Sequence, residues 1–279
     1  MQQLAPDQIA LVNELEPVAA GLLDKHVSSS KEWFPHELVP WSRGRDFEPG
    51  EAWDPDEVHL DPAVRSSLFV NLLTEDNLPY YFRTIESMFG RDSAWGTWVR
   101  RWTAEEGRHS IVLRDYLTVT RMIDPVALER ARMHQVSGGE VPAPDYATDG
   151  IVYVTLQELA TRIAHHNTGK LMDDKAGYEV MKRVAADENR HHLFYRDLGT
   201  AALVAMFLLV IRAGGASLES LPHAAAAPLA AVLFALALAG FGVKAGFVPL
   251  HVWLPGTYAA APPHVAALMS GAMAKLGLY

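Results

Sequence analysis

The sequence predicts an all-α protein, with a helical bundle in residues 1–198 followed by two or three hydrophobic helices in residues 199–279. Three observations predict this fold class. Apolar residues recur at helical spacing through most of the first part, and no alternating run is long enough to form a sheet. The pattern then changes in the second part, where only four charged residues remain and the chain becomes almost wholly apolar.

The predicted helices are separated by segments that contain proline and glycine. Helical spacing predicts Leu4–His26, Pro62–Gly90 with an interruption at Pro79, Ser93–Met122, Pro125–Gln135, Ile151–Leu171 and Lys175–Leu198. Ser28–Asp61 and Ser137–Asp149 hold several Pro and Gly residues and are expected to be loops. Because helices with apolar stripes must bury them against one another, a bundle is the expected architecture.

The composition excludes several classes of function. The chain has no Cys, which rules out disulfides, thiolate metal sites, iron–sulfur clusters and Cys nucleophiles. Its formal net charge is −9, so a general nucleic-acid binder is not expected. Met1–Ala20 lacks the basic and apolar regions of a secretory signal, and we therefore expect the bundle in the cytoplasm.

Two helical segments carry the same motif, an acidic residue followed by Glu-x-Arg-His. The motif occurs as Glu105–His109 and again as Asp187–His191. The Glu and the His of each motif are three residues apart and share a helix face. That face is otherwise apolar, and a buried lone carboxylate is costly unless it is paired or bound to a metal. For either segment alone, a buried salt bridge from Glu to Arg or His is the alternative.

A repeat of the helical unit favours a metal site over such a salt bridge. Glu75 lies 31 residues before Glu106, and Glu158 lies 30 residues before Glu188, each on an apolar helix face. One Glu from each of two helices and Glu-x-x-His from each of two others form the ligand set of ferritin-like dimetal bundles. Four carboxylates and two imidazoles suit a pair of iron or manganese ions. The predicted metal ligands are Glu75, Glu106, His109, Glu158, Glu188 and His191.

Five segments of the bundle resemble the soluble acyl-(acyl-carrier-protein) desaturases, most nearly their bacterial branch. They are Leu72–Tyr80, Trp102–His109, Leu156–Thr161, His166–Gly169 and Ala186–His191. The resemblance covers about residues 1–198 and implies a di-iron oxidoreductase of fatty acid biosynthesis, with the six predicted ligands on iron. Such an enzyme uses O2 and two electrons, usually from ferredoxin, to introduce a cis double bond into an acyl chain on acyl carrier protein. The resemblance also implies a homodimer.

Neighbouring residues gain expected roles from the same resemblance. Thr161, one turn after Glu158, matches a threonine that the family places near the oxygen site, and a hydroxyl bonded to its own helix is the alternative. Arg100, Arg101 and Arg108 form a basic cluster that could dock the acidic carrier protein, and a solvated face with local salt bridges is the alternative. Three further histidines lie beside the motifs but off the ligand positions, where we expect surface or supporting roles. They are His165, His166 and His192.

Residues 199–279 resemble a fragment of a different family, the antiporter-like membrane subunits of respiratory complex I and membrane-bound hydrogenases. The likeness lies in Leu238–Pro255 and Ala261–Gly277. Ala224–Val243 offers about 20 residues without charge, enough to span a bilayer, and with Ala201–Ile211 it could form a membrane hairpin. The residues that match the family's proton path are expected to be non-functional, because so few helices cannot build a half-channel. They are Lys244, His251, His264 and Lys275.

Other functions remain open from the sequence. A ferritin-like oxidase or metal-storage protein shares the ligand set, although desaturase-like loops at Trp41–Asp46 and Thr74–Pro79 argue against it. The tail alone supports a fragment of a proton-translocating NADH–quinone oxidoreductase or hydrogenase membrane subunit. The change of pattern near Asp197–Gly199 falls inside an expected helix and is expected to leave both parts incomplete. This favours a joined reading frame, and hence a non-functional chimera, over a natural gene fusion.

Overall fold

The computed structural model of the chain describes residues 6–141, 144 and 146–212. All regular secondary structure in these residues is helical, as the sequence predicts. The described chain divides into two compact units. The first holds residues 23–141 and 158–191, and the second holds residues 6–22, 144, 146–157 and 192–212.

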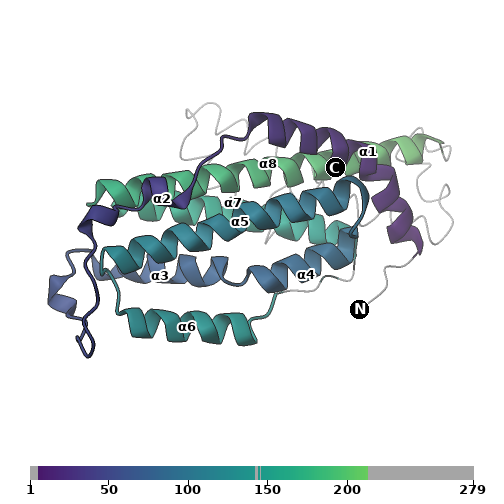
Figure 1. The fold of residues 1–279 in the computed structure, drawn as a ribbon. Helices are drawn as coiled ribbons and strands as arrows, with labels where there is room; N and C mark the ends of the chain where they lie inside the picture. The colour runs from purple at the N-terminus through teal and green to yellow at the C-terminus, as the bar shows by residue number, and fades with distance from the viewer. Residues whose placement is uncertain (1–5, 142–143, 145, 213–279) are drawn as a thin grey trace, which may run out of the picture. The chain divides into compact units, whose positions relative to one another are not determined.

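The predicted helices are present, with most ends shifted by only a few residues. In chain order the elements are α1 (Pro6–Ser29), α2 (Pro35–Leu38), the short 3-10 turns η1 (Trp41–Arg43) and η2 (Pro55–Glu57), α3 (Pro62–Glu75), α4 (Leu78–Phe89), α5 (Ser93–Val119), α6 (Pro125–Gly138), α7 (Ala147–Leu171) and α8 (Lys175–Arg212). The predicted loop before Pro62 therefore contains one short helix and two turns. Figure 1 shows these elements along the chain.

Aspartate and proline together set the starts of α3 and α6. The side chains of Asp61 and Asp124 accept hydrogen bonds from the backbone N–H groups two residues further on, at 2.7 and 2.9 Å. Pro62 and Pro125 follow at the first helical position, where an N–H has no partner within the helix and the fixed φ of proline suits the helix. The sequence thus specifies both helix starts locally.

The helix predicted over Pro62–Gly90 is divided at Asp76–Asn77 into α3 and α4. Pro79 is the cause, because its ring would clash with the carbonyl four residues earlier, that of Glu75, and it has no N–H to bond there. α3 accordingly ends at Glu75, and Pro79 lies in the first turn of α4. The sequence marks the interruption at the proline, whereas the helix ends four residues before it.

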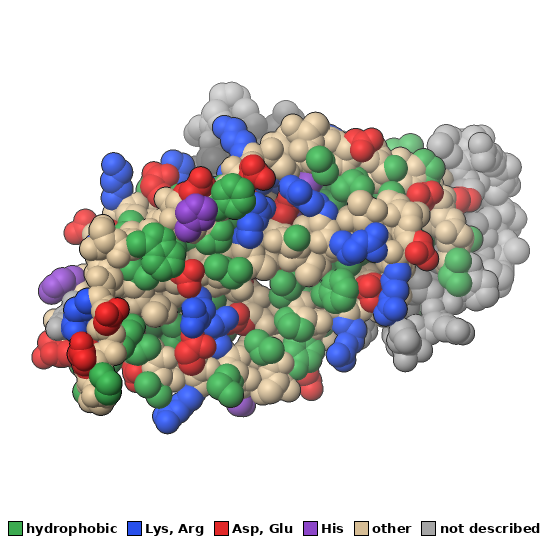
Figure 2. All heavy atoms as spheres, viewed as in Figure 1, with side chains coloured by type: hydrophobic (Ala, Val, Ile, Leu, Met, Phe, Trp, Pro, Cys, Tyr) green, Lys and Arg blue, Asp and Glu red, His purple; other side chains and the backbone are tan. Residues whose placement is uncertain are grey.

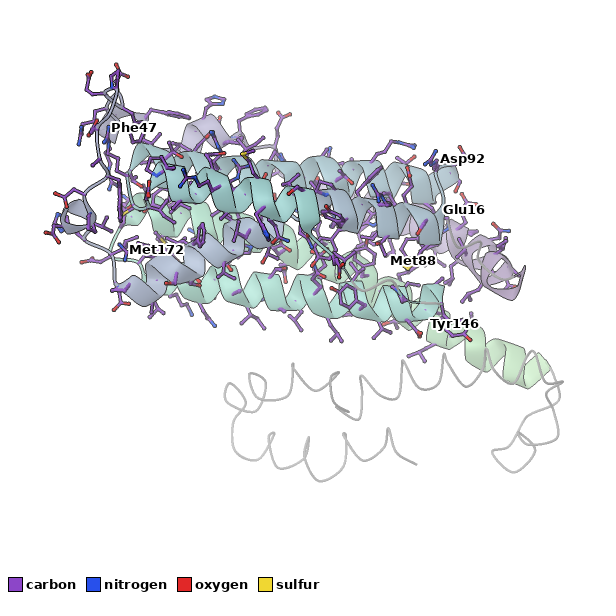
Figure 3. All side chains as sticks on the ribbon, turned by 90° about the horizontal axis from the view of Figure 1, so that it is seen from below. Glu16, Phe47, Met88, Asp92, Tyr146 and Met172 are labelled. Atoms are coloured by element: carbon purple, nitrogen blue, oxygen red, sulfur yellow. The ribbon has the colours of Figure 1, made fainter. Side chains whose placement is uncertain are left out.

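α5 is the central helix of the first unit. In this unit α3 and α4 follow one another along α5, α2 also packs on α5, and α6 packs against α3 (Figure 1). Figure 3 shows the side chains along these helices, with Met172 and Met88 toward opposite ends. Because α5 contacts several neighbours, its residues can meet side chains from more than one helix.

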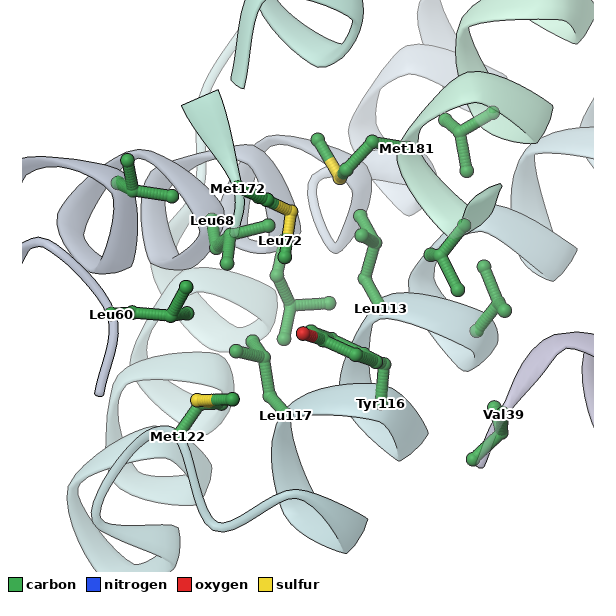
Figure 4. Packing of buried hydrophobic residues seen from close by; sticks show 14 of the residues in the cluster. Val39, Leu60, Leu68, Leu72, Leu113, Tyr116, Leu117, Met122, Met172 and Met181 are labelled. Carbon is green, nitrogen blue, oxygen red and sulfur yellow. The ribbon is translucent and has the colours of Figure 1, made fainter. Parts of the chain in front are cut away.

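An apolar cluster fills the contact between α3, α5 and α8 in the first unit (Figure 4). Leu68 and Leu72 of α3, Leu113 and Tyr116 of α5, and Met181 of α8 are fully buried there. Burying one such aliphatic side chain stabilises a fold by roughly 1.5–3 kcal/mol. The ionisable residues of the two motifs lie further along the same helix stripes, so this packing carries them into the interior.

The second unit, in its described part, is built from the start of α1, the start of α7 and the end of α8. Leu11 and Leu15 of α1, Ile151 and Val154 of α7, and Leu198 of α8 are buried in it. α8 runs without a break to Arg212, and the helix is therefore continuous through the predicted seam between the bundle and the tail.

No helix among the residues described is long and apolar enough to cross a membrane. The predicted span Ala224–Val243 lies outside the described residues, whereas Ala201–Ile211, its predicted partner in a hairpin, lies at the end of α8. On the described surface seen in Figure 2, acidic and basic side chains are interspersed. Membrane attachment therefore stays a prediction from the sequence.

Candidate metal centre

Four helices of the first unit bring the predicted ligands together. Glu75 is the last residue of α3, Glu106 and His109 come from α5, Glu158 comes from α7, and Glu188 and His191 come from α8. All six side chains are buried. The i, i+3 spacing on α5 and α8 directs the Glu and the His of each motif to the same face.

The ligand atoms form two groups that share two carboxylates. Glu75 and His109 belong to the first group, Glu158 and His191 belong to the second, and Glu106 and Glu188 belong to both. Within each group, one candidate ligand atom of every residue lies within 4.8 Å of those of the others. The arrangement suits two metal ions bridged by shared carboxylates.

The imidazole Nδ1 atoms point into these groups. His109 Nδ1 lies 3.1 Å from Glu188 Oε1 and 3.3 Å from Glu106 Oε2. His191 Nδ1 lies 2.7 Å from Glu106 Oε1 and 3.4 Å from Glu158 Oε2. The Nε2 atoms of both rings are directed away from the groups, toward other acidic side chains.

Several buried donor atoms of the site have no hydrogen bond to the described residues and could bind a metal ion instead. Five of them make no hydrogen bond within the described part of the chain. They are Glu106 Oε1, His109 Nδ1, Glu158 Oε2, Glu188 Oε1 and His191 Nδ1. These atoms approach one another at 2.7–3.4 Å without forming hydrogen bonds, and a buried polar atom that lacks a hydrogen bond costs about 1–3 kcal/mol. Carboxylate oxygens and imidazole nitrogens are also the donors that iron and manganese prefer, so the residues present fit a two-metal centre.

The protonation of the metal-free site follows from this crowding. Burial raises the pKa of Glu106 and Glu158, and the neighbouring carboxylate of Glu188 raises both further. Burial alone would lower the pKa of His109 and His191, but the nearby Glu106 carboxylate and other acidic partners raise the pKa of both rings well above its ordinary value. The site therefore retains protons that metal ions would displace.

The acidic residue before each ligand Glu supports the histidine of the opposite motif. Glu105 on α5 lies 2.9 Å, through Oε2, from Nε2 of His191 on α8. Asp187 on α8 lies 3.4 Å, through Oδ2, from Nε2 of His109 on α5. A proton on Nε2 leaves the Nδ1 lone pair of each ring available for a metal. The two motifs thus position one another.

Each of these supporting carboxylates has further partners. Glu105 Oε2 also lies 2.8 Å from His26 Nε2, and Glu105 Oε1 accepts a hydrogen bond from Arg101 Nε at 2.6 Å. Burial alone would raise the pKa of Glu105, but its bonds to the two histidines hold that pKa far below the ordinary value. The carboxylate therefore remains charged and able to accept hydrogen bonds.

Asp187 is the more heavily bonded of the two. Its Oδ2 accepts a hydrogen bond from Trp33 Nε1 at 2.7 Å, and its Oδ1 contacts the guanidinium groups of Arg183 and Arg190. Burial would raise the pKa of Asp187, but the bond to His109 and the neighbouring cations lower it. A fully buried aspartate is thereby kept ionised among donors.

Three contacts orient the ligand carboxylates themselves. His165 Nε2 lies 2.8 Å from Glu75 Oε1, and Trp102 Nε1 donates to Glu158 Oε1 at 2.9 Å. The hydroxyl of Thr161 donates to Glu188 Oε2 at 2.7 Å and lies 3.2 Å from the carbonyl oxygen of Glu158. Thr161 thus bonds to its own helix, as the alternative interpretation expects, and also to a predicted ligand, while its role near an oxygen site stays a prediction.

The histidines off the ligand positions have different surroundings. His165 is buried against Glu75, in the supporting role that the sequence allowed, and His166 is exposed. His192 is half-buried and its Nδ1 lies 3.0 Å from the carbonyl oxygen of Thr155, within the second unit. Of the three, His165 is thus seen to contact a predicted ligand.

The basic cluster makes the local contacts that the alternative interpretation expects. Arg101 pairs with Glu105, and Arg100 donates to the carbonyl oxygen of Arg91 at 2.8 Å. Arg108 lies over the ring of Trp33, 5.0 Å from its centroid, and donates to the Trp33 carbonyl oxygen. Docking of the carrier protein at this cluster stays a prediction.

Some supporting residues were not predicted from the sequence, among them Glu105, Asp187, Trp102, His26 and Trp33. Glu105 and Asp187 carried a signal, because each stands directly before a ligand Glu in the repeated motif. His26 and Trp33 carried none, since they reach the site only through the packing of α1 and the following segment. The four residues predicted for a proton path, Lys244, His251, His264 and Lys275, lie outside the described residues.

Two family models match the chain. Residues 7–206 match the family described as fatty acid desaturase, and residues 190–279 match the transmembrane family of NADH:quinone oxidoreductases and Mrp antiporters. Both resemblances predicted from the sequence are confirmed.

Curated relatives also match much of the chain. The candidate acyl-(acyl-carrier-protein) desaturase DesA1 of Mycobacterium tuberculosis is 47% identical over 204 residues, which are 70% of this chain and 60% of the relative. DesA2 of the same organism is 34% identical over 196 residues, covering 70% of this chain and 71% of the relative. A stearoyl-(acyl-carrier-protein) 9-desaturase of Arabidopsis thaliana is 31% identical over 198 residues, covering 58% of this chain and 49% of the relative. The chain thus spans about 60% of the length of DesA1.

A solved structure matches the fold. The X-ray structure of DesA2 from M. tuberculosis H37Rv aligns with a TM-score of 0.57 at 28% identity, covering 83% of this chain and 96% of that chain. The helical, ferritin-like bundle predicted from the ligand pattern is therefore confirmed.

Proposed function

Because this chain belongs to the fatty acid desaturase family, we propose that it is an O2-dependent oxidoreductase of fatty acid biosynthesis. Its substrate is an acyl chain carried on acyl carrier protein, into which it introduces a cis double bond. The observation that supports this most is the buried set of four carboxylates and two imidazoles, in two groups that share Glu106 and Glu188. The relatives named as acyl-carrier-protein desaturases supply the substrate class.

Two iron ions are the cofactor that we propose for the site. Glu75 and His109 would hold one, Glu158 and His191 the other, and the shared carboxylates both. Four carboxylates balance the charge of two divalent ions, which a site buried in an apolar core requires. Bound there, the irons supply the redox chemistry by which O2 removes hydrogen from an unactivated carbon chain. Manganese is the alternative metal.

The protein's own part is to orient donors and to hold protons. Glu105 and Asp187 fix the imidazole rings, and their hydrogen bonds leave each Nδ1 facing the site. We place Thr161 at the reaction site, because its half-buried hydroxyl donates to Glu188 and can hold a proton beside the shared carboxylate. A ferredoxin-type protein as electron donor and a homodimeric assembly belong to the proposal through the family resemblance.

A product assay tests this function. The full chain is loaded with iron and incubated with ferredoxin, its reductase, NADPH, O2 and acyl carrier proteins bearing saturated chains of several lengths. We expect a cis-monounsaturated acyl product, which gas chromatography with mass spectrometry identifies. Oxidation of Fe2+ and consumption of O2 without unsaturated product would instead favour a ferritin-like oxidase or storage protein.

We also propose that residues 199–279 attach the chain to a membrane, with the bundle on the cytoplasmic side. The support is the uncharged stretch Ala224–Val243 and the match of residues 190–279 to a transmembrane family. We expect the full chain to sediment with membranes on high-speed centrifugation and to be released by detergent, but not by salt. A chain that stays in the supernatant without detergent contradicts this attachment.

A further inference from the structure

Helix α6 is joined to the end of α3 by a partly buried ion pair. Arg132 of α6 donates from Nε to Asp76 Oδ2 at 2.7 Å and from Nη2 to Asp76 Oδ1 at 3.0 Å. Asp76 is only 5% exposed and directly follows the predicted ligand Glu75. A two-point bond between guanidinium and carboxylate fixes orientation as well as distance.

Neighbouring contacts hold the same junction. Gln135 Nε2 donates to Asn77 Oδ1 at 3.0 Å, and Asn77 Nδ2 donates to the carbonyl oxygen of Glu140 at 3.2 Å. The hydroxyl of Tyr80 donates to the carbonyl oxygen of Val136 at 2.9 Å. All the partners lie on α6 or just after it, so hydrogen bonds to one element hold the residues that link α3 to α4.

The junction needs these contacts with α6 because Glu75 is the last residue of α3. Helix ends fray, and a carboxylate at the C-terminal end of a helix meets the negative end of the helix dipole. Glu158, the equivalent residue of the second repeat, lies inside α7 with helix on both sides. The two halves of the ligand set therefore differ, and only the half that contains Glu75 lacks a continuous helix to hold it.

α6 is itself anchored to the helix that carries the first motif. Leu128 is fully buried, and Glu129 lies 3.3 Å from Arg132 Nη1 and 2.8 Å from Nε of Arg114 on α5. An alternating series of charges therefore runs from α5 through α6 to Asp76. Through it, the position of α3 is tied to that of α5.

We propose that α6 is a positioning element of the metal centre, in which Arg132 acts through Asp76 to fix the end of α3 and so the direction of the Glu75 carboxylate. The inference rests on the proposed two-metal site. It gives separate roles to neighbouring residues of the Thr74–Pro79 motif: Glu75 faces the site, Asp76 is held by α6, and Pro79 ends the helix. Because Glu75 belongs to only one of the two ligand groups, replacing Arg132 should lower the affinity for one metal ion and not for the other.

Cobalt titration of the full chain tests this inference. Co2+ binding is followed by its visible absorption and by metal analysis in the wild type, in Arg132→Ala and in the matched control Arg130→Ala, an exposed arginine of the same helix. We expect two Co2+ per chain in the wild type and the control. In Arg132→Ala, one Co2+ should bind about 10- to 100-fold more weakly, as losses of supporting contacts typically do, while the second binds as before.

Further variants separate positioning from folding. The spectrum of Arg132→Ala should resemble that of Glu75→Gln, and Arg132→Ala should add nothing once Asp76→Ala is present. If Arg132→Ala does not fold, Arg132→Lys replaces it, because lysine keeps the charge but not the two-point geometry. Two Co2+ bound with wild-type affinity and spectrum in the folded variant overturn the inference. A wild type that binds no Co2+ instead contradicts the two-metal site itself.

Discussion

Replacing Glu106 or Glu188 by alanine is expected to remove both metal ions from the chain. Each of these carboxylates belongs to both ligand groups, so its loss leaves two ions short of a ligand. Replacing Glu75 or Glu158 should weaken the binding of one ion and leave the other ion bound, because each residue belongs to a single group. Iron analysis of the purified full chain, at equal protein concentration, measures the difference.

Glu179→Ala is the matched control for these variants. Glu179 lies on α8 like Glu188, but it is exposed and its partner is Lys182, one turn away. Its replacement should leave the iron content unchanged. If Glu106→Ala and Glu188→Ala both retain the iron content of the control, the assignment of the shared ligands is wrong.

Replacing Asp187 by alanine should destabilise the metal-free bundle by about 3–5 kcal/mol, as the loss of one partner from a buried ion pair typically does. The change would leave the guanidinium groups of Arg183 and Arg190 and the indole N–H of Trp33 without their acceptor. Urea denaturation of the metal-free full chain, followed by circular dichroism, measures the free energy of unfolding. Absence of metal separates this effect from any loss of binding.

Two comparisons make the Asp187 result specific. Asp173→Ala removes an exposed aspartate from the segment before α8 and should change the free energy of unfolding by less than about 0.5 kcal/mol. Asp187→Asn keeps the shape of the side chain and one acceptor oxygen. Its free energy of unfolding should therefore lie between those of Asp187→Ala and Asp173→Ala. Equal unfolding midpoints for Asp187→Ala and Asp173→Ala would show that Asp187 has no such role.

The sequence predicted the helices and the ligand set because both rest on short, regular spacings. The i, i+3 pairs and the repeated distance between helices with Glu and helices with Glu-x-x-His identify the residues without knowledge of the packing. Pro79 likewise marked the interruption between α3 and α4. Only the position of the break was misplaced, because the clash of proline acts on the residue four positions earlier.

The supporting contacts could not be predicted in the same way. Successive residues of a helix point about 100° apart, so Glu105 and Asp187 face a neighbouring helix and not the centre. Which side chain they meet there depends on how α5 and α8 pack. His26 and Trp33 come from a distant part of the sequence, and no local spacing relates them to the motifs.

Helix α6 illustrates a second limit. Its sequence mixes polar and apolar residues, and among its residues only Leu128 is buried, so α6 is a surface helix. Arg132 has no feature in the sequence that distinguishes it from Arg130. The difference between them arises from Asp76, which lies far from α6 in the sequence and is exposed to it by the break after Glu75.

Iron-edge anomalous diffraction from crystals of the full chain, grown with Fe2+, tests the proposed two-metal centre most directly. We expect two anomalous peaks inside the bundle, one bounded by Glu75 and His109 and the other by Glu158 and His191. Glu106 and Glu188 should contact both peaks. A single peak, no peak, or peaks held by residues other than these six would contradict the account.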